Sequence, residues 1–238
     1  MSKRFIVEEK NITLQEESVL VRGEEVHHIN VLRYKIGDKV YINNYEIKIE
    51  RINKEELEGK IIGNLPEKGI PNVDITLIQA YLKSDKMDYV VQKAVELGVK
   101  SIKPVMSKNT IVKLDSKDRI KKVERLNKIA KEAVEQCGRT DSVMVENIEE
   151  LSKVDLNIYE AILVCHEKSS VSLKDTLLKV KDKTKIAVIV GPEGGLDDAE
   201  VDKILQNTNV NEISLGERIL RAETASLNIL SIIGYEFS

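Results

Sequence analysis

The sequence of 238 residues contains little cysteine, few histidines and no long hydrophobic run, and each absence narrows the class of protein. Its two cysteines, Cys137 and Cys165, fit a reducing compartment. The longest aliphatic stretches, such as Ile186–Val190, are far too short to cross a bilayer. The N-terminal residues lack the sustained apolar region of a secretory signal. We therefore expect a cytoplasmic protein without a membrane-spanning segment.

Motifs for metal, covalent and nucleotide chemistry are missing as well. His27, His28 and His166 are not accompanied by Cys-x-x-Cys or His-Glu-x-x-His spacing, so we expect no metal site. No signature of a catalytic nucleophile surrounds Cys137 or Cys165. The chain also has no Walker loop and no Gly-x-Gly-x-x-Gly fingerprint, which argues against a nucleoside triphosphate or NAD. An α/β hydrolase or a nucleotide-binding enzyme is therefore a poor interpretation.

Positive charge is concentrated in one part of a chain whose net charge is −3. Residues 83–139 carry 15 basic and 8 acidic side chains, whereas residues 140–238 carry 10 basic and 18 acidic ones. A cationic segment of this kind favours binding to the phosphates of a nucleic acid. The Lys-rich segment Arg119–Lys131 also fits a solvated helix face, so charge alone leaves both interpretations open.

The residue patterns predict two domains, residues 1–71 and 72–238. In the first, short segments alternate polar and apolar residues between turn signals, which is typical of a small β-barrel. The predicted elements are strands at Lys39–Asn43, Glu46–Glu50 and Glu58–Ile62 and a short helix at Glu24–Leu32. Residues 65–72 contain two prolines and a glycine and are the expected linker.

After the linker, strands alternate with helices, which predicts an α/β domain with a mostly parallel sheet covered on both faces. The expected strands are Val73–Ala80, Ser101–Met106, Val143–Val145, Ala161–Cys165, Ile186–Val190 and Glu212–Leu215. The expected helices are Lys86–Leu97, Lys117–Gln136, Ser172–Val180, Asp197–Gln206 and Thr224–Tyr235.

Two glycine-bearing segments, Gly191–Leu196 and Leu215–Ala225, each follow a predicted strand and lead into a predicted helix. In α/β sheets, ligands bind where loops leave the carboxyl ends of strands, and glycine lets the backbone approach a ligand closely. We therefore expect the two segments to form two walls of one pocket. A ligand of the adenosine type, held by main-chain groups, is compatible with such a pocket. A tight turn without a ligand is the plainer alternative for Gly191–Leu196.

Several charged side chains fall near the expected pocket. Arg218 and Arg221 precede a predicted helix start. Arg221 has the planar fork of donors that orients an anionic group. Glu193 and Glu223 are either general bases or anions at helix termini, and their spacing favours the second role. Surface pairing of the arginines with Glu217 or Glu223 is the structural alternative.

The two glycine segments, Val190–Leu196 and Leu215–Ala225, resemble the RsmE family of ribosomal RNA methyltransferases within the SPOUT superfamily. Further segments match in the same order, namely His28–Arg33, Lys86–Val99 and Glu132–Arg139. The resemblance implies a small PUA-like β-barrel followed by a SPOUT α/β domain with a trefoil knot. It also implies a homodimer that uses S-adenosylmethionine (SAM) to methylate N3 of a uridine in 16S ribosomal RNA of the small subunit.

The same resemblance implies the residues of the site, none of which is a metal ligand. Those that would hold the cofactor are Leu163, Val164, Cys165, His166, Gly191, Pro192, Glu193, Gly194, Gly195, Leu215, Gly216, Ile219, Leu220 and Arg221. Those that would meet the RNA are Arg33, Lys86, Gln92, Lys93 and Arg139. For catalysis, we expect Arg221 or Arg139 to stabilise a uridine anion and Glu223 to be the candidate base.

The chain departs from the family pattern in one place. Where the family usually has Ser-Glu-Arg, this chain has Ser107, Lys108 and Asn109, so an RNA contact or acid–base role assigned to that stretch does not carry over. The alternative function is an RNA- or ribosome-binding protein without catalysis. Such a protein would have no need of two intact glycine loops.

Overall fold

The computed structural model describes residues 4–65 and 72–237, and the chain forms two compact units. The first unit contains Met1–Ile70 together with Val134–Asp141, and the second contains Pro71–Ala133 and Ser142–Ser238. The segment Val134–Asp141 therefore packs with the N-terminal part of the chain, which its place in the sequence did not indicate. The expected linker, residues 65–72, lies outside the described residues except at its two ends.

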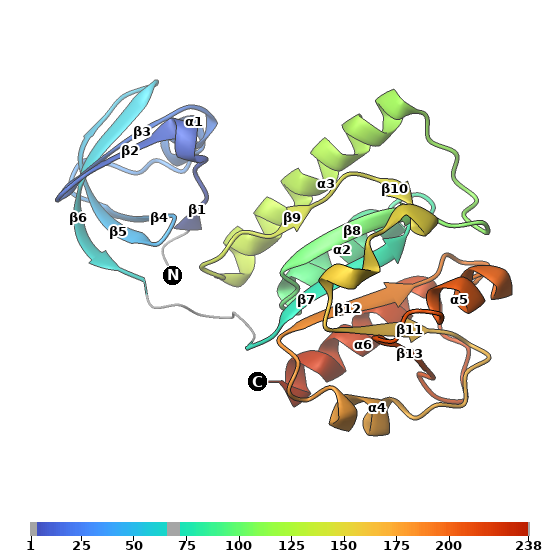
Figure 1. Cartoon of the computed structure of the whole chain (residues 1–238). Coiled ribbons are helices and arrows are strands. Elements are labelled where there is room, and N and C mark those ends of the chain that lie inside the picture. Colours follow the sequence, from blue (N-terminus) through green and yellow to red (C-terminus); the bar gives the residue numbers. More distant parts are fainter. Residues whose placement is uncertain (1–3, 66–71, 238) are drawn as a thin grey trace. The chain divides into compact units, whose positions relative to one another are not determined.

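The first unit is built on a sheet whose strand order, within the described residues, is β1-β4-β5-β6-β3-β2 (Figure 1). Its strands are β1 (Arg4–Phe5), β2 (Ile12–Gln15), β3 (Ser18–Arg22), β4 (Lys39–Ile42), β5 (Tyr45–Ile52) and β6 (Glu56–Asn64), and its one long helix element is α1 (Glu24–Val31). Alternate side chains of these strands point inward and form a core around Phe5, Val21, Ile47 and Leu57. The predicted strands and helix of this region are present, although β5 and β6 run longer than predicted.

Within the part of the chain that the structure describes, the second unit holds a seven-stranded sheet in which every pairing is parallel. The strand order is β10-β8-β7-β12-β11-β13, with β9 pairing with β8. The strands are β7 (Asp74–Ala80), β8 (Ser101–Met106), β9 (Met144–Val145), β10 (Glu149–Glu150), β11 (Ala161–Cys165), β12 (Lys185–Val190) and β13 (Val210–Ile213). The central strands are buried on both faces, which explains their continuous aliphatic sequences.

Helices lie on the faces of this sheet, as the alternating pattern predicts. They are α2 (Lys86–Glu96), α3 (Ser116–Cys137), α4 (Leu173–Lys179), α5 (Asp198–Ile204) and α6 (Ala222–Glu236). In the view of Figure 1, α2 and α6 lie behind the sheet, and the backbone of Gly234 approaches the carbonyl of Leu97. Among the described residues, no helix has the length and apolarity required to cross a bilayer.

The order of the strands places the expected pocket. Strand β7 pairs with β8, the next strand in the sequence. Its other edge pairs with β12, which follows about a hundred residues later. Strand β11 then lies between β12 and β13. The loops that leave the carboxyl ends of β11, β12 and β13 consequently emerge at one edge of the sheet, where open α/β sheets bind their ligands.

Candidate functional site

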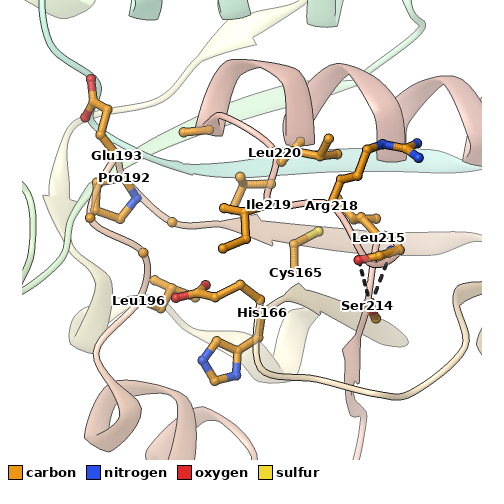
Figure 2. A pocket seen from close by; sticks show the side chains of 18 of the residues that line it. Cys165, His166, Pro192, Glu193, Leu196, Ser214, Leu215, Arg218, Ile219 and Leu220 are labelled. Carbon is orange, nitrogen blue, oxygen red and sulfur yellow. Dashed lines mark hydrogen bonds between the residues drawn. The ribbon is translucent and has the colours of Figure 1, made fainter.

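Three loops at the carboxyl ends of β11, β12 and β13 enclose a pocket of about 300 Å³ (Figure 2). It is lined by Cys165–Glu167, Val190–Leu196 and Ser214–Leu220, and by two residues at the start of α6, Ala222 and Ala225. Figure 2 shows Cys165, Ile219 and Leu220 near the middle of the pocket, whereas the side chains of Arg218 and Glu193 extend away from it on opposite sides. The two glycine segments thus form walls of one pocket, and the end of β11 supplies a third wall.

The segment Gly191–Leu196 folds back on itself so tightly that glycine is required at its first position. A Cβ atom at Gly191 would lie 2.9 Å from the backbone nitrogen of Leu196 and 3.1 Å from the carbonyl carbon of Gly195. Gly195 has a φ of +71°, a left-handed conformation that side chains other than that of glycine rarely adopt. The turn therefore presents main-chain atoms to the pocket at its three glycines.

The loop after β13 combines an ordered start with an exposed tip. Ser214 Oγ accepts a hydrogen bond of 3.2 Å from the Gly216 backbone N–H, and Gly216 has a φ of +107°. At the tip, Ile219 is 87% exposed although it borders the pocket. Because the Ile219 side chain is so exposed to water, it can cover an apolar or aromatic group of a ligand.

A buried polar pair beneath the pocket connects two of its walls. Gln79 at the end of β7 is fully buried, and its amide donates to the carbonyls of Ala80, Val190 and Gly191. The hydroxyl of Ser226, on α6, lies 2.5 Å from the Gln79 carbonyl oxygen. The pair therefore fixes the glycine turn relative to the helix that follows the third loop.

Replacing Gln79 by leucine is expected to lower the free energy of unfolding by about 2–3 kcal/mol, because buried polar groups lose their partners. Urea unfolding monitored by circular dichroism measures the change. Ser226→Ala is expected to cost less, about 1 kcal/mol, since the amide of Gln79 keeps its three acceptors. Because both variants disrupt one network, the double variant should cost less than the sum of the two; a strictly additive result would contradict this account.

Lys86, at the start of α2, lies between two carboxylates. Its Nζ is 3.5 Å from Glu193 Oε1 on the glycine turn and 3.4 Å from Glu223 Oε2 on α6. Burial raises the pKa of Glu193, but the backbone N–H groups of Glu193 and Lys83 and the Lys86 ammonium outweigh burial and lower that pKa below 4.5. Glu223 Oε2 is buried and accepts no hydrogen bond from the described residues. Lys86 therefore holds the glycine turn and α6 together through charge.

Lys86→Met is expected to reduce stability at neutral pH and to weaken its dependence on pH. A carboxylate whose pKa is lowered by folding stabilises the protein above its unfolded pKa, and this contribution is lost as the pH falls through the folded pKa. The wild type should therefore lose stability between about pH 5 and pH 3, and the variant should lose less. Urea midpoints across this range measure the effect. Lys93→Met is the control, because Lys93 pairs with Glu96 on its own helix.

The thiol of Cys165, on the wall of the pocket, is expected to be unreactive near neutral pH. Burial raises the pKa of the Cys165 thiol to about 12, so the thiol is protonated and uncharged near neutral pH. Cys137, at the end of α3, is exposed. In a thiol-titration experiment at about pH 8, Cys137 should react in the folded protein and Cys165 only after addition of urea. Rapid modification of Cys165 in the folded protein would show that the thiol is more accessible than the structure indicates.

Lys108 and Asn109, where the chain departs from the family pattern, both contact the neighbourhood of the glycine turn. Lys108 Nζ lies 2.6 Å from Asp197 Oδ2, and its backbone N–H donates to Glu200. The amide of Asn109 donates to the carbonyls of Gly194 and Gly195 at 3.4 and 3.3 Å. In this chain the two residues therefore support the turn.

The structure brings most of the expected cofactor residues together. Those that line the pocket are Cys165, His166, Gly191, Pro192, Glu193, Gly194, Gly195, Leu215, Gly216, Ile219 and Leu220. Leu163 and Val164, which are fully buried in β11, are not among the residues that line it. Arg221 is exposed at the N-terminus of α6, between two lining residues but outside the lining itself.

Some lining residues were not predicted. Glu167 and Ser214 border the pocket, and each is next to a predicted residue in the sequence. Only the exact ends of the strands before them could have indicated their position. The buried pair of Gln79 and Ser226 carries no sequence signal, because neither residue lies in a glycine segment. Among the described residues, no group of three or more histidine, cysteine, aspartate or glutamate side chains is arranged to hold a metal ion.

The expected RNA-contacting residues lie in different environments. Arg33 is exposed in the turn after α1, with a φ of 63°, and Gln92 is exposed on α2. Lys86 and Lys93 are engaged with carboxylates, as described above. Arg139 is only 3% exposed and forms a two-pronged pair with Asp141, at 2.9 and 2.8 Å, within the first unit. Its guanidinium is therefore directed to Asp141 and not to solvent.

Comparison with known proteins supports one family throughout the chain. Residues 70–234 match a family model described as an RNA methyltransferase domain, and residues 21–62 match one described as an RNA methyltransferase PUA domain. The chain is 32% identical to the ribosomal RNA small subunit methyltransferase E of Bacillus subtilis, over 99% of this chain and 97% of that protein. It is 31% identical to the protein of the same name from Mesomycoplasma hyopneumoniae, over 96% and 97% of the two chains.

A solved structure gives the same result. The ribosomal RNA small subunit methyltransferase E of Neisseria gonorrhoeae, bound to S-adenosyl methionine, superposes with a TM-score of 0.85 at 27% identity. The match covers 99% of this chain and 98% of that one. The similarity therefore extends over both units of the chain.

Proposed function

Because the chain belongs to the ribosomal RNA small subunit methyltransferase E (RsmE) family, we propose that its pocket binds SAM and that it methylates N3 of a uridine in 16S ribosomal RNA. The chain is a SAM-dependent methyltransferase of ribosomal RNA. The observation that carries the proposal for the site is the meeting of three loops at the carboxyl ends of parallel strands, inside the segment that matches the RNA methyltransferase domain.

The residues of the pocket fit SAM. The turn Gly191–Gly195 offers main-chain donors and acceptors with little side-chain bulk, and Cys165 and Ile219 offer apolar contact. When bound, SAM supplies a methyl group that is already strongly electrophilic. The task of the protein is then to hold donor and acceptor in line and to exclude water, and such orientation is worth roughly 7–11 kcal/mol.

Of the two arginines considered for catalysis, Arg221 is the better placed. Its guanidinium is exposed directly after the pocket-lining residue Leu220, whereas that of Arg139 is buried against Asp141. Uridine N3 must lose a proton before or during attack, and this loss places negative charge on the base. Arg221 stabilises that charge. Glu223 is the candidate proton acceptor, with its buried oxygen beside the Lys86 ammonium.

The remaining parts of the proposal concern the whole protein. Residues 1–71 form a PUA-like barrel that binds RNA, and residues 72–238 form a SPOUT domain whose C-terminal loops are tied in a trefoil knot. The match of residues 21–62 to a PUA domain supports the first assignment, and the gathering of three late loops around one pocket is what a knot of this kind produces. The RNA meets Arg33, Lys86, Gln92 and Lys93, whereas the expected contact Arg139 is held by Asp141. The active form is a homodimer in the cytoplasm, where the small subunit is assembled.

The decisive experiment is mass mapping of ribosomal RNA nucleosides from cells that lack this gene. We expect 3-methyluridine of the small subunit to disappear and to return when the wild-type gene is restored. An unchanged 3-methyluridine level would refute the proposed reaction. Calorimetry of the purified protein with SAM tests the pocket separately, since a protein that only binds RNA would show no heat of binding.

A further inference from the structure

Three carboxylates border the pocket, on Glu167, Glu193 and Glu217, and the structure engages them to different degrees. Glu193 accepts a hydrogen bond from the Lys83 backbone and lies beside the Lys86 ammonium, so its charge is already compensated. Within the described residues, the carboxylate of Glu167 forms no hydrogen bond or ion pair. The ammonium of the adjacent Lys168 is bound by Asp198 at 2.6 Å. Glu167 is exposed and interacts electrostatically with Lys168, but no hydrogen bond within the described residues holds its carboxylate, which brings a negative charge to the pocket wall.

The position of this carboxylate is defined by the glycine turn. A Cβ atom at Gly195 would lie 2.7 Å from Glu167 Oε1 and 3.2 Å from Oε2. The carboxylate thus rests against the turn in the space that a side chain at position 195 would need. It joins the wall from β11 to the wall from β12, and the uncharged thiol of Cys165 lies two residues before it.

A carboxylate placed in this way selects for positive charge. A cation that leaves water for a pocket loses hydration, and a nearby opposite charge offsets that loss. SAM carries a sulfonium cation, whereas S-adenosylhomocysteine (SAH), the product that remains after methyl transfer, has a neutral sulfur. The α-ammonium group is present in both molecules and cannot distinguish them.

We propose that Glu167 recognises the sulfonium charge of the methyl donor and so makes the pocket prefer SAM to SAH. This inference rests on the proposed function of the pocket as the SAM site. It assigns a specificity-determining role to a residue that the glycine segments do not contain. When the methyl group is transferred, the sulfur loses its positive charge. SAH therefore binds the pocket more weakly than SAM does, which favours its release.

The test is calorimetry of the full-length protein with SAM, SAH and sinefungin, an analogue in which a carbon that bears an ammonium group replaces the methylated sulfonium. In Glu167→Gln, the affinity for SAM and for sinefungin should fall about fivefold at low ionic strength, and the affinity for SAH less than twofold. Glu167→Asp keeps the charge on a shorter side chain and should fall between the wild type and Glu167→Gln. Glu217→Gln removes the same charge from another exposed residue at the border of the pocket, one that does not contact the glycine turn, and should leave the ratio of SAM to SAH affinity unchanged.

Equal losses for SAM and SAH would overturn the inference, because they would assign the carboxylate to the shared ammonium. Unchanged affinity for both molecules in Glu167→Gln, or an equal change of the ratio in Glu217→Gln, would also overturn it. All three results leave wild-type binding of SAM intact, so they are distinct from failure of the proposed function, in which the wild type itself binds no SAM.

Discussion

Replacing Arg221 by alanine is expected to lower the turnover number for RNA methylation by about a hundredfold, with the affinity for SAM changed less than twofold. The physical reason is that a positioned cation stabilises charge that exists only while the uridine proton leaves, so its loss affects the transition state and not the bound cofactor. Single-turnover methylation of small-subunit RNA measures the rate, and calorimetry measures SAM binding.

Arg218→Ala is the matched control for this variant. Arg218 lies in the same loop and borders the pocket, but its side chain extends away from the centre in Figure 2. We expect its turnover to stay within about threefold of the wild type, the effect of a change in surface charge. Near-normal turnover of Arg221→Ala, or an equal loss in Arg218→Ala, would show that Arg221 does not act on the uridine.

Gly191→Ala is expected to weaken SAM binding about tenfold or more, because the added methyl group displaces the turn that forms one wall of the pocket. The nearest atoms to the new Cβ belong to the backbone of Leu196 and Gly195, at 2.9 and 3.1 Å, and backbone cannot move aside as a flexible side chain does. The urea midpoint should fall as well, since the turn joins β12 to α5.

Gly194→Ala provides the control within the same turn. Its Cβ would lie 3.5 Å from the Cβ of Asn109, which is ordinary van der Waals contact. We therefore expect SAM affinity within about twofold of the wild type. If the two variants bind SAM equally well, the close approach at Gly191 does not shape the pocket.

The sequence predicted the α-helices of the second unit and every strand except β10, because its strands and helices have distinct residue patterns. Boundaries were less certain where a strand is half exposed. The last strand was predicted at Glu212–Leu215, but β13 is Val210–Ile213, since its pairing with β11 begins at Val210 opposite Ile162. Pairing with a neighbour, and not the local alternation of residue types, decides the ends of such a strand.

For the site, glycine-rich loops after strands indicated the pocket, but not which side chains face it. Leu163 and Val164 were expected at the cofactor; both faces of their strand are covered, so their side chains are buried, and their contact with the cofactor stays a prediction. Arg139 was expected at the RNA, yet Asp141 two residues later binds its guanidinium. Contacts of this kind depend on how side chains pack, which a sequence pattern does not contain.

The pairing of β7 with β12 also governs when the pocket can form during synthesis. One edge of β7 remains without its partner until residues 185–190 have left the ribosome, and the last wall of the pocket follows only with residues 214–220. A nascent chain therefore exposes an unpaired apolar strand edge while about a hundred further residues are synthesised, a state prone to association with other chains. Cofactor binding can begin only when nearly the whole polypeptide is available, so every molecule that captures SAM is one whose synthesis is almost complete.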